Sequence, residues 1–417
     1  MQLKRVVVTG LGALTPIGNS KDEYWKNLIA GVSGAAAITH FDASLFKTQF
    51  ACEVKNFNVE DFIDRKEARK MDAFTQYAIV SSDEALKDSG LLDSNPNRDR
   101  IGVVWGSGIG GLNTFQEEAK NYFGSDGIPR LNPFFIPKMI ADMAAGQISI
   151  KHELRGPNYV TVSACASATN ALIDAFNLIR LGKSDAIVTG GSEACVNEMG
   201  MGGFNALRAL STRNDSPETA SRPFDVDRDG FVLGEGSGAL ILEEYEHAIQ
   251  RGATIYAEII GSGMSADAHH MTAPHPDGLG AKNTMLSALE DANISPSEVD
   301  YVNVHGTSTP LGDVAEVKAI QAVFGEDAYK LNISSTKSMT GHLLGAAGAI
   351  EAIACVMAVK EDIVPPTINH FTDDPNLDPK LNLTFNKAEK RTVNIALSNT
   401  FGFGGNNTSV IVKKFKP

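Results

Sequence analysis

One local pattern occurs twice in this 417-residue chain: an apolar strand, a turn of small residues, and a helix. The first copy covers residues 159–176 and the second covers residues 331–351. The strand and glycine-rich turn at residues 254–263 likewise repeat those at residues 6–18. Two halves of similar layout that meet near residue 253 indicate an internal duplication.

The predicted strands are apolar and rich in β-branched residues, and they alternate with helical segments such as residues 22–31 and 66–90. This alternation predicts an α/β fold in layers, with sheets buried on both faces. No low-complexity segment or long linker separates the halves. We therefore expect residues 1–253 and residues 254–417 to be two similar halves that pack as one unit.

Cys165 lies where the first copy of the pattern passes from strand to helix. Unpaired N–H groups and the helix dipole stabilise negative charge at such a position. We therefore expect a lowered thiol pKa and a nucleophilic thiolate. The small residues on both sides would leave room for a substrate. A buried core cysteine is the alternative, and only partner groups can distinguish the two readings.

Candidate partners follow other predicted strands. His305 ends the strand that begins at Val299, His342 opens the glycine-rich helix of the second copy, and Phe403 lies in a glycine turn after a further strand. Ligands of open α/β sheets bind outside the carboxyl ends of the strands. We therefore expect these groups and Cys165 to converge on one pocket. Each histidine taken alone also fits a surface or core position.

Composition and spacing exclude several other functions. With 37 Lys and Arg against 50 Asp and Glu, the net charge of −13 disfavours nucleic acid as a partner. The four cysteines are scattered, which indicates neither disulfides nor a zinc site. The histidines of the loop at residues 266–275 lack a helical zinc spacing. The glycines at positions 10 and 12 do not complete a dinucleotide fingerprint.

No apolar run approaches the roughly 20 residues of a membrane span. The N-terminal sequence lacks the long apolar region of a signal peptide and runs into the strand at Val6. These features predict a protein of the reducing cytoplasm with no membrane partner.

Several longer segments of the chain closely resemble those of β-ketoacyl-[acyl-carrier-protein] synthases. The matching segments are residues 163–167, 209–215, 222–236, 305–313, 335–348 and 398–406. The resemblance runs from Val6 to Lys413 and is nearest to the elongating synthases of bacterial type II fatty-acid synthesis. It implies a thiolase-like fold with duplicated halves in five α-β-α-β-α layers, usually as a homodimer.

The resemblance also implies an acyltransferase that lengthens an acyl chain by two carbons. Cys165 matches the nucleophile that takes the acyl chain from the carrier protein as a thioester. His305 and His342 match the histidines that assist decarboxylation of malonyl-carrier, whose enolate then attacks that thioester. Backbone amides matching those of Cys165 and Phe403 would hold the oxyanion, and Lys337 matches a lysine that orients the site.

Several further residues match functional positions of the family. Those implied to bind substrate are Ile109, Phe204, Thr272, Thr307, Thr309 and Phe401. Ile109 matches a position lining the acyl tunnel, and Phe403 also matches an aromatic gate. Residues implied to dock the acyl carrier protein are Arg65, Lys66, Arg69, Lys70, Arg130 and Arg208. Carrier proteins are acidic, as this chain is, so docking needs such a local basic patch.

The resemblance requires no cofactor, but some relatives hold a structural Na⁺ or K⁺ ion. The matching residues are Asn303, Glu351, Ser398 and Asn399. The alternative for Glu351 is an ion pair with Lys337.

Other activities of similar proteins fit less well. Degradative thiolases use a second cysteine as base, and the turn at residues 402–405 has none. Initiating synthases have asparagine where His342 stands, and non-catalytic chain-length factors lack the nucleophile. A cysteine hydrolase would release free acid. An elongating ketosynthase of polyketide or aryl-polyene synthesis is the main alternative.

Overall fold

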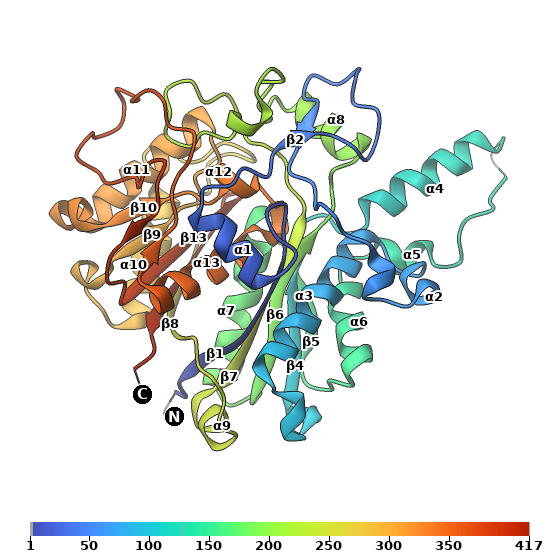
Figure 1. Ribbon diagram of the computed structural model, residues 1–417, viewed down its shortest axis with the longest axis horizontal. Helices are drawn as coiled ribbons and strands as arrows, with labels where there is room; N and C mark the ends of the chain where they lie inside the picture. The colour runs from blue at the N-terminus through green and yellow to red at the C-terminus, as the bar shows by residue number, and fades with distance from the viewer. Residues whose placement is uncertain (1–2, 127, 417) are drawn as a thin grey trace.

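A computed structural model describes residues 3–126 and 128–416 of the chain (Figure 1). Its main sheet has ten strands in the order β10-β9-β13-β14-β8-β1-β7-β6-β4-β5. The strands of the first half are β1 (Val6–Leu14), β4 (Ile101–Gly106), β5 (Asn158–Thr161), β6 (Ala186–Glu193) and β7 (Gly236–Glu244). Those of the second half are β8 (Ala257–Ala266), β9 (Tyr301–Asn303), β10 (Asn332–Ser334), β13 (Ile395–Gly402) and β14 (Asn406–Lys414).

The two halves of the sheet repeat one another strand by strand. From the centre outward, β1-β7-β6-β4-β5 corresponds to β8-β14-β13-β9-β10. In both series the first two pairings are antiparallel and the last two are parallel. The predicted duplication is therefore confirmed. A short antiparallel pairing of β1 with β8, at residues 6–8 and 257–259, joins the halves into one sheet.

Helices complete five layers, as predicted. The outer layers are α3 (Ala73–Ser89) with α6 (Met143–His152), and α10 (Leu279–Ala292) with α11 (Pro310–Phe324). Between the two halves of the sheet lie α7 (Ser167–Arg180) and α13 (Ala347–Glu361), near the middle of Figure 1. Every residue of α13 from Ala347 to Val359 is buried, because sheets cover it on both sides. Its many alanines allow that close packing.

The remaining elements are shorter or peripheral. They are α1 (Lys21–Ile29), α2 (Arg65–Ala68), α4 (Leu112–Gly124), α5 (Phe135–Met139), α8 (Glu198–Ala206), α9 (Tyr245–Gln250), α12 (Lys337–Thr340) and the strand pairs β2 (Ala36–Ala37) with β3 (Phe50–Ala51) and β11 (Ile363–Val364) with β12 (Glu389–Lys390). The arm of α4 and α5 projects from one side (Figure 1). No helix in the described part of the chain has both the length and the apolar character to cross a membrane.

Two expectations about local structure are corrected. The helix predicted over residues 66–90 is split into α2 and α3, because the Asp72 carboxylate accepts the Phe74 N–H and starts a new helix there. The strand before Cys165 is not buried. It is the edge strand β5, which pairs only with β4, and Val162 just after it is 65% exposed.

Candidate active site

A cavity of about 670 Å³ opens between the two halves, at the carboxyl ends of β4, β5, β9 and β13. Both halves line it, as expected for ligands of α/β sheets. It brings together most of the predicted residues, namely Ile109, Cys165, Phe204, Arg208, Thr272, His305, Thr307, Thr309, His342, Phe401 and Phe403. The predicted convergence of the nucleophile, the two histidines and the glycine turn is confirmed.

Cys165 lies in a 3₁₀ turn at Ala164–Ala166, directly before α7 and not within its first turn. Ala164 has a left-handed backbone with φ of 52°. The same turn recurs at Leu344–Ala346 before α13, where Leu344 has φ of 48° and Gly345 takes the place of Cys165. The geometry of this turn therefore belongs to the repeated unit.

The thiol of Cys165 is not ionised in this pocket. Burial raises the pKa of Cys165 to about 12, against an ordinary value of 9.0. The charge of Lys337 and the backbone N–H groups of Phe403 and Cys165 itself act in the opposite direction but do not prevail. The expected lowering of the thiol pKa is therefore wrong, because loss of solvation exceeds the stabilising fields.

The two histidines lie beside the thiol. His342 Nε2 is 3.0 Å from Cys165 Sγ, and the rings of His305 and His342 are 5.2 Å apart, edge to face. Burial, followed by the charge of Lys337, lowers the pKa of both imidazoles well below 6.5. Both rings are therefore neutral at pH 7, and a neutral imidazole can both donate and accept a hydrogen bond.

Lys337 lies behind the histidines, on α12, and is 1% exposed. Its ammonium pairs with the Glu351 carboxylate, which is fully buried on α13. Burial raises the pKa of Glu351, and the Lys337 ammonium opposes that rise. The ion pair keeps a positive charge near the reacting groups without exposing it to solvent.

Two residues of the site, Glu316 and Phe231, were not predicted from the sequence. Glu316 accepts hydrogen bonds from the backbone N–H groups of His305 and Gly306, at 2.9 and 2.8 Å, and so fixes the turn that carries the imidazole. The ring of Phe231 lies edge-on to that of His342, with centroids 5.3 Å apart. An acidic residue in the apolar stretch 314–323 was the only hint of Glu316 in the sequence.

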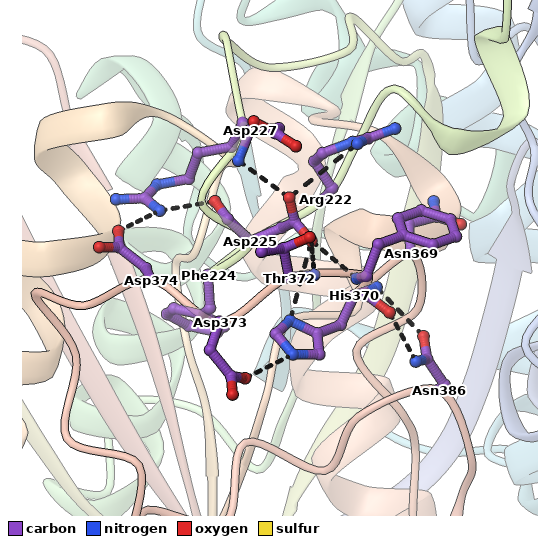
Figure 2. A network of polar contacts seen from close by, with 12 residues as sticks. Arg222, Phe224, Asp225, Asp227, Asn369, His370, Thr372, Asp373, Asp374 and Asn386 are labelled. Carbon is purple, nitrogen blue, oxygen red and sulfur yellow. Dashed lines mark hydrogen bonds and ion pairs between the residues drawn. The ribbon is translucent and has the colours of Figure 1, made fainter.

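A polar network around Asp225 connects residues 222–227 to residues 369–374 (Figure 2). The Asp225 carboxylate accepts hydrogen bonds from the backbone N–H groups of Phe371 and Thr372, at 2.7 and 2.9 Å. Arg228 lies three residues further along and donates to the carbonyl oxygen of Thr309 at 3.2 Å. Arg228 also donates to the carbonyl oxygen of Asp225, at 2.7 Å. Because Thr309 lines the cavity, Arg228 connects this network to one wall of the cavity.

The predicted docking residues fall into two groups. Arg208 is exposed and lines the cavity. The basic residues of segment 65–70 do not line it, and Arg65 and Lys70 pair with acidic neighbours, Glu60 at 3.2 Å and Glu67 at 2.7 Å. Arg130 is exposed and also lies outside the cavity wall.

The residues matched to a cation site fit that role in part. Asn303 and Ser398 are register partners on β9 and β13, and Asn303 Oδ1 and Ser398 Oγ are buried without a hydrogen-bond partner. Such oxygens suit a hard monovalent cation. Glu351 instead pairs with Lys337, and Asn399 Oδ1 accepts from the Ser409 hydroxyl at 2.7 Å. Among the described residues, no cluster of three or more His, Cys, Asp and Glu could hold a metal.

Comparison with protein families settles the relationship. The model of the beta-ketoacyl synthase N-terminal domain matches residues 3–248, and that of the C-terminal domain matches residues 256–371. The chain belongs to the β-ketoacyl synthase family. It is thus an acyl-transferring condensing enzyme with the thiolase-like fold that its layers display.

Two curated relatives and one solved structure show how similar the chain is to individual members of the family. The chain is 52% identical over 415 residues to 3-oxoacyl-[acyl-carrier-protein] synthase 2 of Staphylococcus aureus strain N315, covering 100% of this chain and 99% of that one. It is 50% identical over 416 residues to the protein of the same name from Synechocystis, with the same coverage. A solved beta-ketoacyl synthase from Burkholderia phymatum is similar with a TM-score of 0.91 and 37% identity, over 99% of this chain and 100% of that one.

A second solved structure contains a partner. It is a type II polyketide ketosynthase in complex with its acyl-carrier protein, bound to the hexaketide, with a TM-score of 0.91 and 34% identity over 100% of both chains.

Proposed function

We propose that this chain is an elongating 3-oxoacyl-[acyl-carrier-protein] synthase of fatty-acid synthesis. It would join malonyl-carrier to an acyl chain held on Cys165, with loss of CO₂ and growth by two carbons. The observation that carries this proposal is the placement of Cys165 Sγ 3.0 Å from His342 Nε2, in a cavity that His305 also lines. The curated relatives at 50–52% identity bear the matching name.

Acyl transfer begins from the protonated thiol. As Sγ attacks the thioester carbonyl of the acyl-carrier, its proton passes to His342 Nε2 and then to the departing pantetheine sulfur. The backbone N–H groups of Cys165 and Phe403 stabilise the oxyanion formed at that carbonyl. Keeping the thiol neutral until substrate arrives protects a buried sulfur from side reactions with solvent oxidants.

Condensation then uses the neutral imidazoles as donors. With His342 in the tautomer that carries hydrogen on Nε2, N–H groups of His305 and His342 stabilise the enolate oxygen that forms as malonyl-carrier loses CO₂. The enolate carbon attacks the acyl carbonyl on Cys165, the C–S bond breaks, and the thiolate takes up one proton from solvent water as the 3-oxoacyl-carrier leaves. Lys337 acts through its field, because it favours developing negative charge and disfavours imidazolium.

The acyl carrier protein is the proposed macromolecular partner, in line with the carrier complex of the polyketide relative. Arg208 at the cavity rim would meet its acidic surface, and segment 65–70 would extend the contact. No tightly bound cofactor is proposed. A structural Na⁺ or K⁺ ion would take Asn303 Oδ1 and Ser398 Oγ as ligands. Four free, buried cysteines suit the reducing cytoplasm as its location.

We also propose a homodimer, formed along the exposed edge strand β5. This strand has unpaired backbone groups on one side, and Val162 beside it is 65% exposed. The nearby arm of α4 and α5 exposes Phe123 and Ile136 at 80% and 54%. Apolar edges of this kind are normally covered by a partner. Light scattering of the purified chain should give twice the mass of 44.4 kDa.

The proposed function is tested by intact mass spectrometry. Wild type and Cys165→Ala are incubated with palmitoyl-carrier, and malonyl-carrier is then added. Acyl mass on wild type alone, discharged as a 3-oxoacyl-carrier two carbons longer, is the expected result. Absence of label on Cys165, or discharge only as free acid, would overturn the condensing role. Selective use of polyketide starter units would instead assign the chain to a specialised pathway.

A further inference from the structure

Glu193 is the last residue of β6, and its side chain is fully buried beside the cavity without lining it. Five groups donate hydrogen bonds to its carboxylate, and they are the N–H groups of Gly108 at 2.8 Å, Ile109 at 3.2 Å, Gly110 at 3.2 Å and Gly345 at 3.0 Å, and the hydroxyl of Ser107 at 3.1 Å. Burial raises the pKa of Glu193, and the four backbone donors oppose that rise.

The two carboxylate oxygens serve different sets of donors. Oε1 accepts from the Ser107 hydroxyl and from the N–H groups of Ile109 and Gly110. Oε2 accepts from Gly108 N–H and Gly345 N–H. Oε2 therefore connects the turn after β4 to the turn before α13, which belong to different halves of the chain.

These turns carry the groups that meet the acyl chain. The turn after β4 presents Ile109, which lines the cavity and is 43% exposed. Gly345 lies three residues after His342. The backbones touch directly, because a Cβ on Gly345 would collide with Gly108, and a Cβ on Gly108 would lie 3.0 Å from the carbonyl oxygen of Ala164. The carboxylate thus lies where three turns meet.

We propose that Glu193 is a positioning residue that holds the Ile109 turn against the Cys165 and His342 turns and thereby sets which acyl lengths are accepted. This inference rests on the proposed function, since it concerns the acyl chain delivered to Cys165. A displacement of the turn by about 1 Å alters reactivity strongly in sites of this kind. A carboxylate is suited to the task because it accepts on both oxygens.

Glu193→Gln tests the inference at constant size. Glutamine has one acceptor oxygen, and its NH₂ group must take the place of the second carboxylate oxygen, where it faces N–H donors. The oxygen is expected to remain with Ser107, Ile109 and Gly110, which are more numerous. The NH₂ group then faces Gly108 and Gly345, so the connection between the two halves is the one that is lost.

The experiment measures the rate of Cys165 acylation by octanoyl-carrier and by palmitoyl-carrier in wild type, Glu193→Gln, Ile109→Ala and the double variant. We expect Glu193→Gln to change the ratio of the two rates about tenfold. In the Ile109→Ala background the same substitution should change it less than about twofold, because the side chain being positioned is gone. An unchanged ratio, or an equal change in both backgrounds, would overturn the inference.

Two further variants separate positioning from loss of stability. Ser107→Ala removes one uncharged donor and should change the ratio in the same direction but less, so it carries the test if Glu193→Gln does not fold. Glu84→Gln is the matched control, because Glu84 also accepts two backbone N–H groups, from Ala13 and Lys21, away from the cavity. It should leave the ratio unchanged. Failure of wild type to acylate or condense would instead refute the proposed function.

Discussion

His342 Nε2 lies 3.0 Å from Cys165 Sγ in a pocket where burial keeps both groups uncharged. A thiolate–imidazolium pair would show the opposite protonation, with the thiol pKa lowered and the imidazole pKa raised. The nucleophile of this site is therefore generated during the reaction and is not stored as a charged pair.

Alkylation by iodoacetamide should report this protonation state. Because the pKa of Cys165 is about 12, the rate should rise about tenfold per pH unit from neutral pH to about pH 11. Mass spectrometry measures the labelling, with Cys165→Ala as the control, since Cys165 lines the cavity and the other three cysteines do not. A rate that levels off below about pH 8 would contradict the protonated thiol.

Malonyl decarboxylation should be insensitive to pH around neutrality. His305 and His342 have pKa values well below 6.5, so activity should fall only in distinctly acid solution. The free energy of unfolding should also fall as the pH falls below about 6.5, because the unfolded chain then binds protons that the folded chain does not. In Lys337→Met the acid limb of the pH–rate profile should move to higher pH, because loss of the lysine charge raises the pKa of both histidines. An acid limb already near pH 6.5 in wild type would refute the lowered pKa values.

The buried pair of Lys337 and Glu351 should show strong coupling in stability. Either Lys337→Met or Glu351→Leu leaves one charge buried alone and should lower the free energy of unfolding by about 3–5 kcal/mol. The double variant should regain most of that loss, because it buries no charge. Urea denaturation measures the free energy of unfolding of wild type, the two single variants and the double variant. Additive losses in the double variant would show that the two charges do not depend on each other.

Carrier docking should depend on Arg208, which lines the cavity and is exposed. Arg208→Glu places negative charge at the cavity rim and should raise KM for acyl-carrier about tenfold, while a pantetheine thioester is used as before. Steady-state kinetics with both substrates measures the difference. Lys183→Glu is a matched control, since Lys183 is exposed near the opposite end of β6. Equal losses on both substrates would argue against a docking role.

Much of this site could be predicted because its parts follow local rules. Cys165, His305 and Phe403 each follow an apolar strand, and the carboxyl ends of such strands meet at one edge of the sheet. The duplication could be predicted because both copies pass from an apolar strand through a short turn into a helix. These features depend on neighbours in sequence.

Other features depend on neighbours that are distant in sequence. Glu193 and Glu316 have buried carboxylates whose partners are backbone N–H groups of other turns, which no side-chain pattern identifies. The shift of the Cys165 pKa was predicted with the wrong sign because the loss of solvation on burial exceeds the effect of Lys337 and of the neighbouring backbone N–H groups. The edge position of β5 likewise follows from strand order and not from its apolar sequence.

Gly345 stands in the second half where Cys165 stands in the first, and any side chain there would collide with the backbone of Gly108. The second copy of the reactive turn is therefore closed to every nucleophile, whatever mutation supplies. The half that carries Gly345 instead supplies both histidines of the cavity. Two copies of one structural unit therefore contribute different groups to a single reactive centre.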